Sequence, residues 1–233
     1  MELESLKREV LEANLELVRR KLVIYTWGNV SVIDRERRLV IIKPRGIAYE
    51  EMDPDDMCVV DMDGVQMEGK LLPSVDLDIH MAIYRRFPQV GAITHTHSTY
   101  ATAWAQARRD IPVYGTTHAD HFCGPIPCTR DMLAEEVTSD YEKNTGDLVV
   151  NTLLERGLEP DEMFGVLVAG HGPFTWGSTA ESAVENSVIL EELAKMALLT
   201  ERLEPRPMPL RRYMLEKHFC RKHGSDAYFY QSK

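Results

Sequence analysis

The sequence lacks any apolar run that approaches the ~18 residues needed by a membrane-spanning helix. Its first ten residues are charged and contain no apolar h-region, so they do not resemble a secretory signal peptide. Cysteine is scarce: the four present, at positions 58, 123, 128 and 220, form no C-x-x-C pair. These absences predict a reduced, cytoplasmic protein whose thiols are small buried hydrophobic groups, and they disfavour a cysteine-based zinc site.

Positive charge is also in deficit, since 27 Lys and Arg residues face 37 Asp and Glu residues, for a formal net charge of −10. This balance excludes a general nucleic-acid or anionic-membrane surface, but it allows a small basic pocket for an anionic metabolite. The fractions of hydrophobic (44%) and charged (27%) residues are those of an ordinary globular protein.

No repeat, low-complexity tract or Gly/Ser linker divides the chain, and we interpret residues 1–233 as a single domain. Short β-type stretches occur among long helical patterns without regular βαβ units, which predicts a three-layer α/β/α fold on a central, largely antiparallel sheet. Helices are expected over 2–20, 75–87, 99–107, 179–199 and 210–221, and strands over 29–33, 39–43, 58–61, 65–67, 90–94 and 164–169.

Three local sequence signals predict where these elements begin or where the chain turns. Asp63-Gly64 is expected to form a hairpin turn, and Ser98 to cap the helix that follows it. Ser178 and Glu181 are expected to form a capping box ahead of the long helix near the C-terminus.

Two histidines, His95 and His97, follow the apolar run 90–94 at a spacing of i and i+2. Residues at this spacing lie on the same side of a strand, so both imidazoles could bind one metal ion at ~2.0–2.1 Å. His171 adds a third imidazole at the exit of another predicted strand, between two glycines that allow close backbone approach. A hydrogen-bonded core role is the alternative for each histidine alone. Together they are typical of an open metal site, with zinc as the expected ion.

Asp76 is the best candidate for a fourth metal ligand. It lies in the first turn of a predicted helix, where the helix dipole favours a carboxylate for structural reasons alone, and the pattern does not decide between the two roles. Asp76 and His80, at i and i+4, could form a helical metal site of their own. We rank that site second, because His80 could equally be an outer or surface residue.

Three further polar segments are candidates for acid–base chemistry or anion binding. The segment 115–121 concentrates Thr, His and Asp side chains and is expected to be a loop or short strand end, with a hydrogen-bonded turn as its alternative role. Residues 26–31 and 43–46 put glycines beside polar or basic side chains at strand edges, where they could hold an anion together with Ser74 at a helix N-terminus. Lys43 considered alone would be a solvated strand residue.

The strings that carry these residues resemble the class II (zinc) aldolase/epimerase family nearly end to end. Within it they favour the sugar-phosphate 4-epimerase branch, because the segment 115–120 and Asp76 both match that branch. The matching strings are Thr-Trp-Gly-Asn-Val-Ser (26–31), Asp-Arg-Glu-Arg (34–37), Thr-His-Thr-His-Ser (94–98), Gly-Thr-Thr-His-Ala-Asp (115–120), Ile-Pro-Cys-Thr-Arg (126–130), His-Gly-Pro-Phe (171–174) and Arg-Lys-His-Gly (221–224).

The resemblance implies one zinc ion per subunit, held by Asp76, His95, His97 and His171, in a homotetramer with active sites between subunits. It further implies that the substrate is a small sugar phosphate. The implied reaction inverts C4 of L-ribulose 5-phosphate to give D-xylulose 5-phosphate, by retro-aldol cleavage of the C3–C4 bond and its re-formation on the other face of the aldehyde fragment. A dication suits this chemistry because it neutralises the charge that develops on the enediolate.

Two proton carriers are needed on opposite sides of the aldehyde carbonyl. By resemblance, Asp120 is one carrier and a tyrosine near the C-terminus is the other, with Tyr230 favoured and Tyr228 as the alternative. The positions expected to bind or support substrate are Gly28, Asn29, Lys43, Arg45, Gly46, Ser74, Val75, Thr116, Glu142 and His218.

Three positions depart from the family strings. Arg45 stands in place of the Ser of Lys-Pro-Ser-Gly, Val75 in place of the second Ser of Ser-Ser-Asp, and Phe229 in place of the catalytic tyrosine. Arg45 could replace a lost hydroxyl with a bidentate anion partner, whereas a phenyl ring cannot carry a proton.

These departures leave alternatives open. One is a class II aldolase or epimerase that acts on a different sugar phosphate or sugar acid, and a metal-dependent dehydratase is a more distant one. A homologue that keeps the fold without the chemistry is another, although the intact metal residues and Asp120 count against it.

Overall fold

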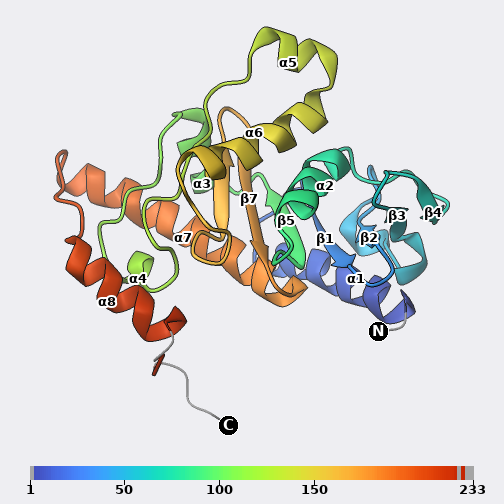
Figure 1. The fold of residues 1–233 in the computed structure, drawn as a ribbon, viewed down its shortest axis with the longest axis horizontal. Helices are drawn as coiled ribbons and strands as arrows, with labels where there is room; N and C mark the ends of the chain where they lie inside the picture. Colours follow the sequence, from blue (N-terminus) through green and yellow to red (C-terminus); the bar gives the residue numbers. More distant parts are fainter. Residues whose placement is uncertain (1–2, 225–226, 229–233) are drawn as a thin grey trace.

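A seven-stranded sheet forms the centre of the fold in the computed structural model, which describes residues 3–224 and 227–228 (Figure 1). Its strands are β1 (Gly28–Asp34), β2 (Leu39–Ile42), β3 (Cys58–Asp61), β4 (Gln66–Glu68), β5 (Ala92–Thr96), β6 (Gly165–Val168) and β7 (Gly172–Gly177). They follow the order β4-β3-β2-β1-β5-β7-β6, and each neighbouring pair is antiparallel. The expected antiparallel α/β architecture is therefore confirmed.

The described helices are α1 (Leu3–Arg19), α2 (Leu77–Arg86), α3 (Thr99–Gln106), α4 (Thr116–Ala119), α5 (Ala134–Ser139), α6 (Tyr141–Glu155), α7 (Ala180–Leu203) and α8 (Arg212–His223), with 3-10 turns at Tyr49–Glu51 and Pro54–Asp56. One face of the sheet packs against α1 and the first turns of α7, and the other packs against α2, α3 and α6. The strands serve both layers because successive side chains alternate between the two faces of a sheet. In β1, for example, Val30 and Val32 join the core under α1, whereas Ile33 joins the core under α2.

Most of the expected elements are present, with ends that differ by a few residues. The Asp63-Gly64 turn connects β3 to β4 as predicted, and Gly64 has a φ of +88° there. The expected strand 90–94 lies two residues further along as β5, which brings His95 into the sheet.

Three local predictions are wrong. The segment 115–121 is not a loop or strand end, because Thr116–Ala119 forms the helical turn α4, with the Asp120 N–H donating to the Thr116 carbonyl at 2.9 Å. The capping box of α7 is formed by Thr179 and Ser182, since Thr179 is the last residue with an extended backbone. Ser98 is at the N-cap of α3 but its hydroxyl makes no capping hydrogen bond.

The strand β7 and the helix α6 were not foreseen. β7 begins with Gly172-Pro173, and both residue types are depleted in strands. In α6, Gly146 weakens the helical signal, but it allows α6 to approach α2: a Cβ at Gly146 would lie 2.7 Å from the Ala82 Cβ. The glycine that obscured the helix is therefore the one that lets it pack.

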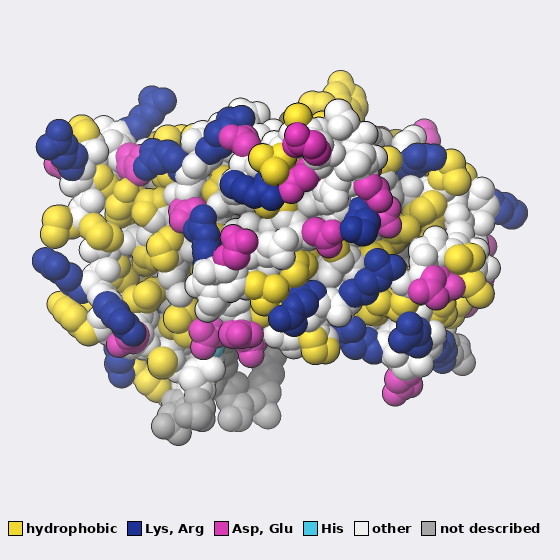
Figure 2. All heavy atoms as spheres, turned by 45° about the horizontal axis from the view of Figure 1, so that its top comes forward, with side chains coloured by type: hydrophobic (Ala, Val, Ile, Leu, Met, Phe, Trp, Pro, Cys, Tyr) yellow, Lys and Arg dark blue, Asp and Glu magenta, His cyan; other side chains and the backbone are white. Residues whose placement is uncertain are grey.

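Surface and thiol chemistry agree in part with expectation. Acidic and basic side chains are interspersed over the face shown in Figure 2, with hydrophobic side chains between them. No helix in the described part of the chain is long and apolar enough to cross a membrane. All four cysteines are free; Cys58 and Cys128 are buried, but Cys123 is half-buried and Cys220 is exposed. The expectation of four buried thiols is therefore wrong for Cys220, which lies on α8.

Candidate active site

The antiparallel register brings the predicted metal residues to one end of the sheet. Asn29 in β1 lies opposite His95 in β5, and His95 lies opposite Phe174 in β7. His171 lies in the tight turn that joins the end of β6 to the start of β7. Two strand ends and one turn therefore converge on the same point.

Two glycines make this convergence possible. Gly28 has a φ of +135°, and a Cβ there would lie 2.7 Å from the His95 carbonyl oxygen. At Gly172 a Cβ would lie 2.8 Å from the Thr96 carbonyl oxygen. Any side chain at either position would push apart the backbones that carry the histidines, so glycine is required at both.

The three predicted histidines form a compact cluster. One ring nitrogen from each of His95, His97 and His171 lies within 4.8 Å of the other two. The buried His95 donates from Nδ1 to the Pro173 carbonyl oxygen at 2.9 Å, and its ring stacks on Phe174 at 4.1 Å between centroids. Because a carbonyl can only accept, Nδ1 carries the proton and the Nε2 lone pair is free for a metal.

The protonation states of the cluster also fit a metal ion. Burial lowers the pKa of His97 and of His171, with the neighbouring histidines lowering each further, so both imidazoles are neutral at physiological pH. A neutral imidazole is the form that ligates a metal. The buried Nδ1 of His171 has no hydrogen-bond partner among the described residues. An all-nitrogen donor set of this kind suits zinc, among other divalent transition metals.

Asp76, at the N-cap of α2, lines the same cavity as His97 and His171. Its Oδ2 accepts a hydrogen bond from Asn29 Nδ2 at 2.7 Å, and the same amide group donates to Ser74 Oγ at 3.0 Å. Burial acts to raise the Asp76 pKa, but the nearby histidines and Asn29 outweigh it and hold the pKa below its usual value. Asp76 is therefore an ionised carboxylate in the same cavity, as a fourth ligand requires, although it lies outside the compact group of ligating atoms that the three histidines form.

His80 is not the surface residue that the sequence allowed. It is fully buried one turn along α2, where its Nδ1 lies 2.7 Å from the Ser31 hydroxyl, and burial lowers its pKa to about 3. It does not belong to the cluster of metal-ligating nitrogens, so the alternative helical metal site is not formed among the described residues.

A cavity of about 260 Å³ opens beside the cluster and collects the predicted anion-binding residues. Lys43, expected to be solvated if it had only a strand role, is 2% exposed, and its Nζ donates to the carbonyl oxygens of Pro44 at 3.1 Å and Ile47 at 3.4 Å. Burial lowers the pKa of Lys43 to about 8. The cavity is lined by Thr26, Trp27, Gly28, Asn29, Lys43, Pro44, Arg45, Gly46, Ser74, Val75, Asp76, His97 and His171.

Trp27 belongs to this lining although the sequence analysis did not single it out. Its position inside the family string 26–31 carried no signal that would separate it from a packing residue. Only the structure shows that its side chain is exposed and lines the cavity.

The predicted proton carrier Asp120 lies elsewhere. Two side chains of α8 bind its carboxylate. Arg221 donates from Nε and Nη2 to the two oxygens at 2.8 and 2.6 Å, and His218 Nδ1 lies 3.0 Å from Oδ1. Burial acts to raise the Asp120 pKa, but these two partners hold it below its usual value. Figure 1 shows α4 and α8 at one end of the molecule and β1–β4 at the other.

Thr116, Glu142 and Tyr228 do not line the cavity of their own chain. Thr116 begins α4 and Glu142 is in the first turn of α6, and neither lines the cavity. Tyr228 is 63% exposed with Lys217 Nζ 5.2 Å from its ring centroid, whereas Tyr230 and Phe229 lie outside the described residues. Among the described residues, a single chain therefore brings together the metal and anion residues but not Asp120 or Tyr228.

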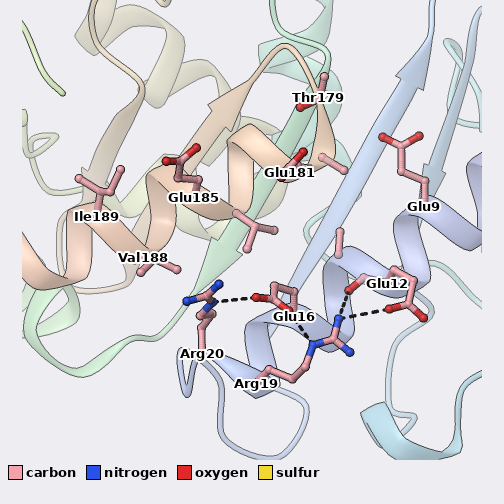
Figure 3. A pocket seen from close by; sticks show the side chains of 13 residues that line it. Glu9, Glu12, Glu16, Arg19, Arg20, Thr179, Glu181, Glu185, Val188 and Ile189 are labelled. Carbon is pink, nitrogen blue, oxygen red and sulfur yellow. Dashed lines mark hydrogen bonds and ion pairs between the residues drawn. The ribbon is translucent and has the colours of Figure 1, made fainter. Parts of the chain in front are cut away.

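A larger hollow of about 870 Å³ lies between α1 and α7 and contains none of the predicted site residues (Figure 3). Its two arginines are already paired: Arg19 Nε and Arg20 Nε donate to Glu16 at 2.6 and 2.7 Å. The volume of a hollow alone therefore does not identify the candidate active site in this protein.

The fold and the histidine cluster define a class II aldolase-type metal enzyme. Residues 8–198 match the family described as the class II aldolase and adducin N-terminal domain, and the chain belongs to that family.

Similar proteins narrow the class. L-ribulose-5-phosphate 4-epimerase UlaF of Salmonella paratyphi B (strain ATCC BAA-1250 / SPB7) is 53% identical over 229 residues, covering 98% of this chain and 100% of the relative. The same protein of Salmonella typhi is also 53% identical over the same span. Full-length similarity at this level places the chain among the epimerases, which are isomerases.

Solved structures agree on the fold. An L-fuculose 1-phosphate aldolase superposes with a TM-score of 0.78 at 27% identity, covering 92% of this chain and 94% of the aldolase. The L-fuculose-1-phosphate aldolase of Thermus thermophilus, at 21% identity, has a TM-score of 0.68 over 85% of this chain and 96% of its own.

Asn29 is expected to control metal affinity through Asp76. Replacing Asn29 with Ala removes the 2.7 Å hydrogen bond that orients the carboxylate. The affinity for Zn²⁺ should then fall by about 10- to 100-fold, the usual cost of losing a partner of a metal ligand. Competition with a chelator measures it. Ser74→Ala is the control: it removes a 3.4 Å contact to the same carboxylate and the 3.0 Å contact to the Asn29 amide, but it keeps the Asn29–Asp76 hydrogen bond and should change affinity less. Equal losses in both variants would show that Asn29 has no special role.

Proposed function

We propose that this protein is a zinc-dependent epimerase that converts L-ribulose 5-phosphate to D-xylulose 5-phosphate at C4. The observation that carries the proposal is the meeting, in one cavity, of a three-histidine cluster with an adjacent carboxylate and a cationic wall. That arrangement can hold a metal ion and a phosphorylated substrate side by side. The full-length similarity to enzymes named for this reaction supports the substrate.

The metal residues would be His95, His97, His171 and Asp76, and the ion would be zinc, one per subunit. When bound, zinc supplies a Lewis acid that neutralises the charge developing on the ketose oxygen as the C3–C4 bond breaks. The chain's own residues do the rest of the positioning. Asn29 holds Asp76 toward the cluster, and Pro173 holds the His95 ring in the tautomer that leaves Nε2 free.

The phosphate would bind at the wall formed by Lys43, Arg45, Gly46 and Ser74. Arg45 is exposed at the bend after Lys43, where its planar guanidinium can bind two phosphate oxygens. Val75 supplies no hydrogen bond to an anion. We therefore assign the main charge contact to Arg45, and a supporting one to the buried ammonium of Lys43.

Proton transfer would involve Asp120 as one carrier, with Arg221 and His218 holding its carboxylate. Tyr230, or Tyr228 in its place, is proposed as the carrier on the opposite side. Thr116, in α4 next to Asp120, and Glu142, in the first turn of α6, are proposed to support the substrate.

A homotetramer with shared sites explains why Asp120 and His218 do not line the cavity of their own chain. In a ring of identical subunits, α4 and α8 of one subunit can complete the cavity of the next. The cytoplasmic location stays an expectation from the sequence.

A second candidate function is a class II aldolase, or an epimerase for a different sugar phosphate or sugar acid. Arg45 and Val75 at the anion wall favour it, because together they replace the hydroxyl groups that the resemblance leads us to expect with one planar cation and one apolar side chain. The fold shared with L-fuculose 1-phosphate aldolase is compatible with cleavage that is not followed by re-addition.

The zinc-loaded protein is expected to convert L-ribulose 5-phosphate to D-xylulose 5-phosphate, measured by chromatographic separation of the two ketose phosphates. Asp120→Asn should lower kcat by about 100-fold or more with zinc content unchanged, since it removes a general acid–base group. His171→Gln should lower both zinc content and activity. Absence of the epimer with wild-type protein would contradict the proposal, and free dihydroxyacetone with glycolaldehyde phosphate would support the aldolase instead.

Arg45→Ser is expected to raise KM for L-ribulose 5-phosphate by about tenfold or more with a smaller effect on kcat, because a charged hydrogen bond to the phosphate is lost. Steady-state kinetics at fixed ionic strength measure the change. Arg8→Ser, on the exposed side of α1, is the matched control for the lost positive charge. An unchanged KM would remove Arg45 from the anion wall.

Shared sites can be tested by mixing two inactive variants, His97→Asn and Asp120→Asn, through co-expression. A hybrid site is intact when its histidines come from the Asp120→Asn chain and its Asp120 comes from the His97→Asn chain; the reverse hybrid carries both substitutions. Random assembly of a ring should therefore restore roughly a quarter of the wild-type sites. Activity that stays at the level of the separate variants would show that each chain completes its own site.

A further inference from the structure

Trp27 differs from the other two tryptophans of the chain in its exposure. Trp104 and Trp176 are 3% and 1% exposed, whereas Trp27 is 52% exposed. Its ring lines the cavity beside the histidine cluster, with its centroid 6.3 Å from that of His97 and the planes tilted by 45°. An aromatic ring left open to a polar cavity costs hydration free energy, so its placement calls for a role.

The main chain that carries the ring is constrained on both sides of Trp27. The Trp27 N–H donates to the Ile24 carbonyl at 3.1 Å, and the next residue is Gly28, which has a positive φ and no room for a Cβ. Tyr25, with a φ of 52°, packs edge-on against Trp27 at 6.3 Å between centroids. The segment therefore places the flat indole ring at the cavity, between Tyr25 and His97.

The cavity otherwise offers polar side chains and backbone, and among the described residues its apolar lining consists of Trp27, Pro44 and Val75. Val75 is 52% exposed. An apolar flat surface touches a small molecule without directional hydrogen bonds. It can keep the molecule in contact, and exclude water, without selecting one of its faces.

Epimerisation by bond cleavage requires that the aldehyde fragment stays in the site without being held in one orientation. When the C3–C4 bond of L-ribulose 5-phosphate breaks, the C4 hydroxyl loses its proton and the bonding electron pair stays on C3. This gives glycolaldehyde phosphate and the enediolate of dihydroxyacetone. The aldehyde must turn over before C3 attacks its other face and its oxygen regains a proton. If it leaves first, C3 is protonated and two free products form, with no change of oxidation state overall.

We propose that Trp27 is the residue that retains the aldehyde fragment while it turns, and that it thereby decides between epimerisation and cleavage. This inference rests on the proposed function. Trp27 contacts the fragment through its ring face, and the anion wall at Arg45 tethers the phosphate. The aldehyde end, which must rotate between the two proton carriers, rests on the ring face, which makes no directional hydrogen bond that would hold it in one orientation.

The test is the partition between D-xylulose 5-phosphate and free glycolaldehyde phosphate in single turnovers of the zinc-loaded enzyme. Trp27→Ala should raise the released fraction by about tenfold, and Trp27→Phe, which keeps a flat ring, should stay within about twofold of wild type. Zinc content and tetramer mass are measured on every variant, and both should be unchanged. An unchanged partition in Trp27→Ala overturns the inference.

Ile24→Ala is the matched control, because Ile24 is 57% exposed in the same segment and does not line the cavity, and the change keeps the carbonyl that accepts from the Trp27 N–H. It should leave the partition near wild type. A shift as large as that of Trp27→Ala, or loss of the tetramer in both variants, would assign the effect to packing of the segment and overturn the role of the ring.

Fluorescence separates this inference from the proposed function. Trp27 is the exposed tryptophan of the three, so acrylamide should quench it selectively, and saturating L-ribulose 5-phosphate should protect it. Wild-type protein that makes no epimer but still shows protection contradicts the epimerase and leaves the contact in place. Epimer formation with no protection overturns the contact.

Discussion

The structure depends on the antiparallel pairing of β1, β5 and β7 at one end of the sheet. Register sets which side chains meet: Asn29 faces His95 across one pair, and His95 faces Phe174 across the other. A slip of one residue would turn His95 to the opposite face of the sheet and dissolve the cluster. The tight β6–β7 turn adds His171 only because β7 is paired to β5 in this register.

Around that pairing, neighbouring side chains and carbonyl groups position the residues that would bind the metal ion. Phe174 stacks on His95, Pro173 fixes its tautomer, and Asn29 joins the strand to the N-terminus of α2 through Asp76. Each contact restricts a group that a metal ion would otherwise have to order on binding. The anion wall at Lys43 and Arg45 comes directly after the end of β2, which is the strand next to β1 in the sheet.

Much of this was predictable from local sequence. The i, i+2 histidines at a strand end and the glycines around His171 carry their geometry in the chain itself, and the family strings added Asp76. Three features were not readable. The burial of Lys43 and His80 depends on packing from distant elements. Residues 116–119 form a helical turn that packs against α8, nearly a hundred residues further along the chain. The separation of Asp120 from the cavity is a property of the whole fold, and no spacing in the sequence records it.

The buried ammonium of Lys43 has a consequence for the balance of protons. With its pKa lowered to about 8, part of the population has lost this proton in mildly alkaline buffer. An anion bound beside Lys43 favours the charged form and raises its pKa again. Substrate binding near pH 8 is then accompanied by uptake of a proton from the buffer, so the heat of binding depends on the ionisation enthalpy of the buffer chosen.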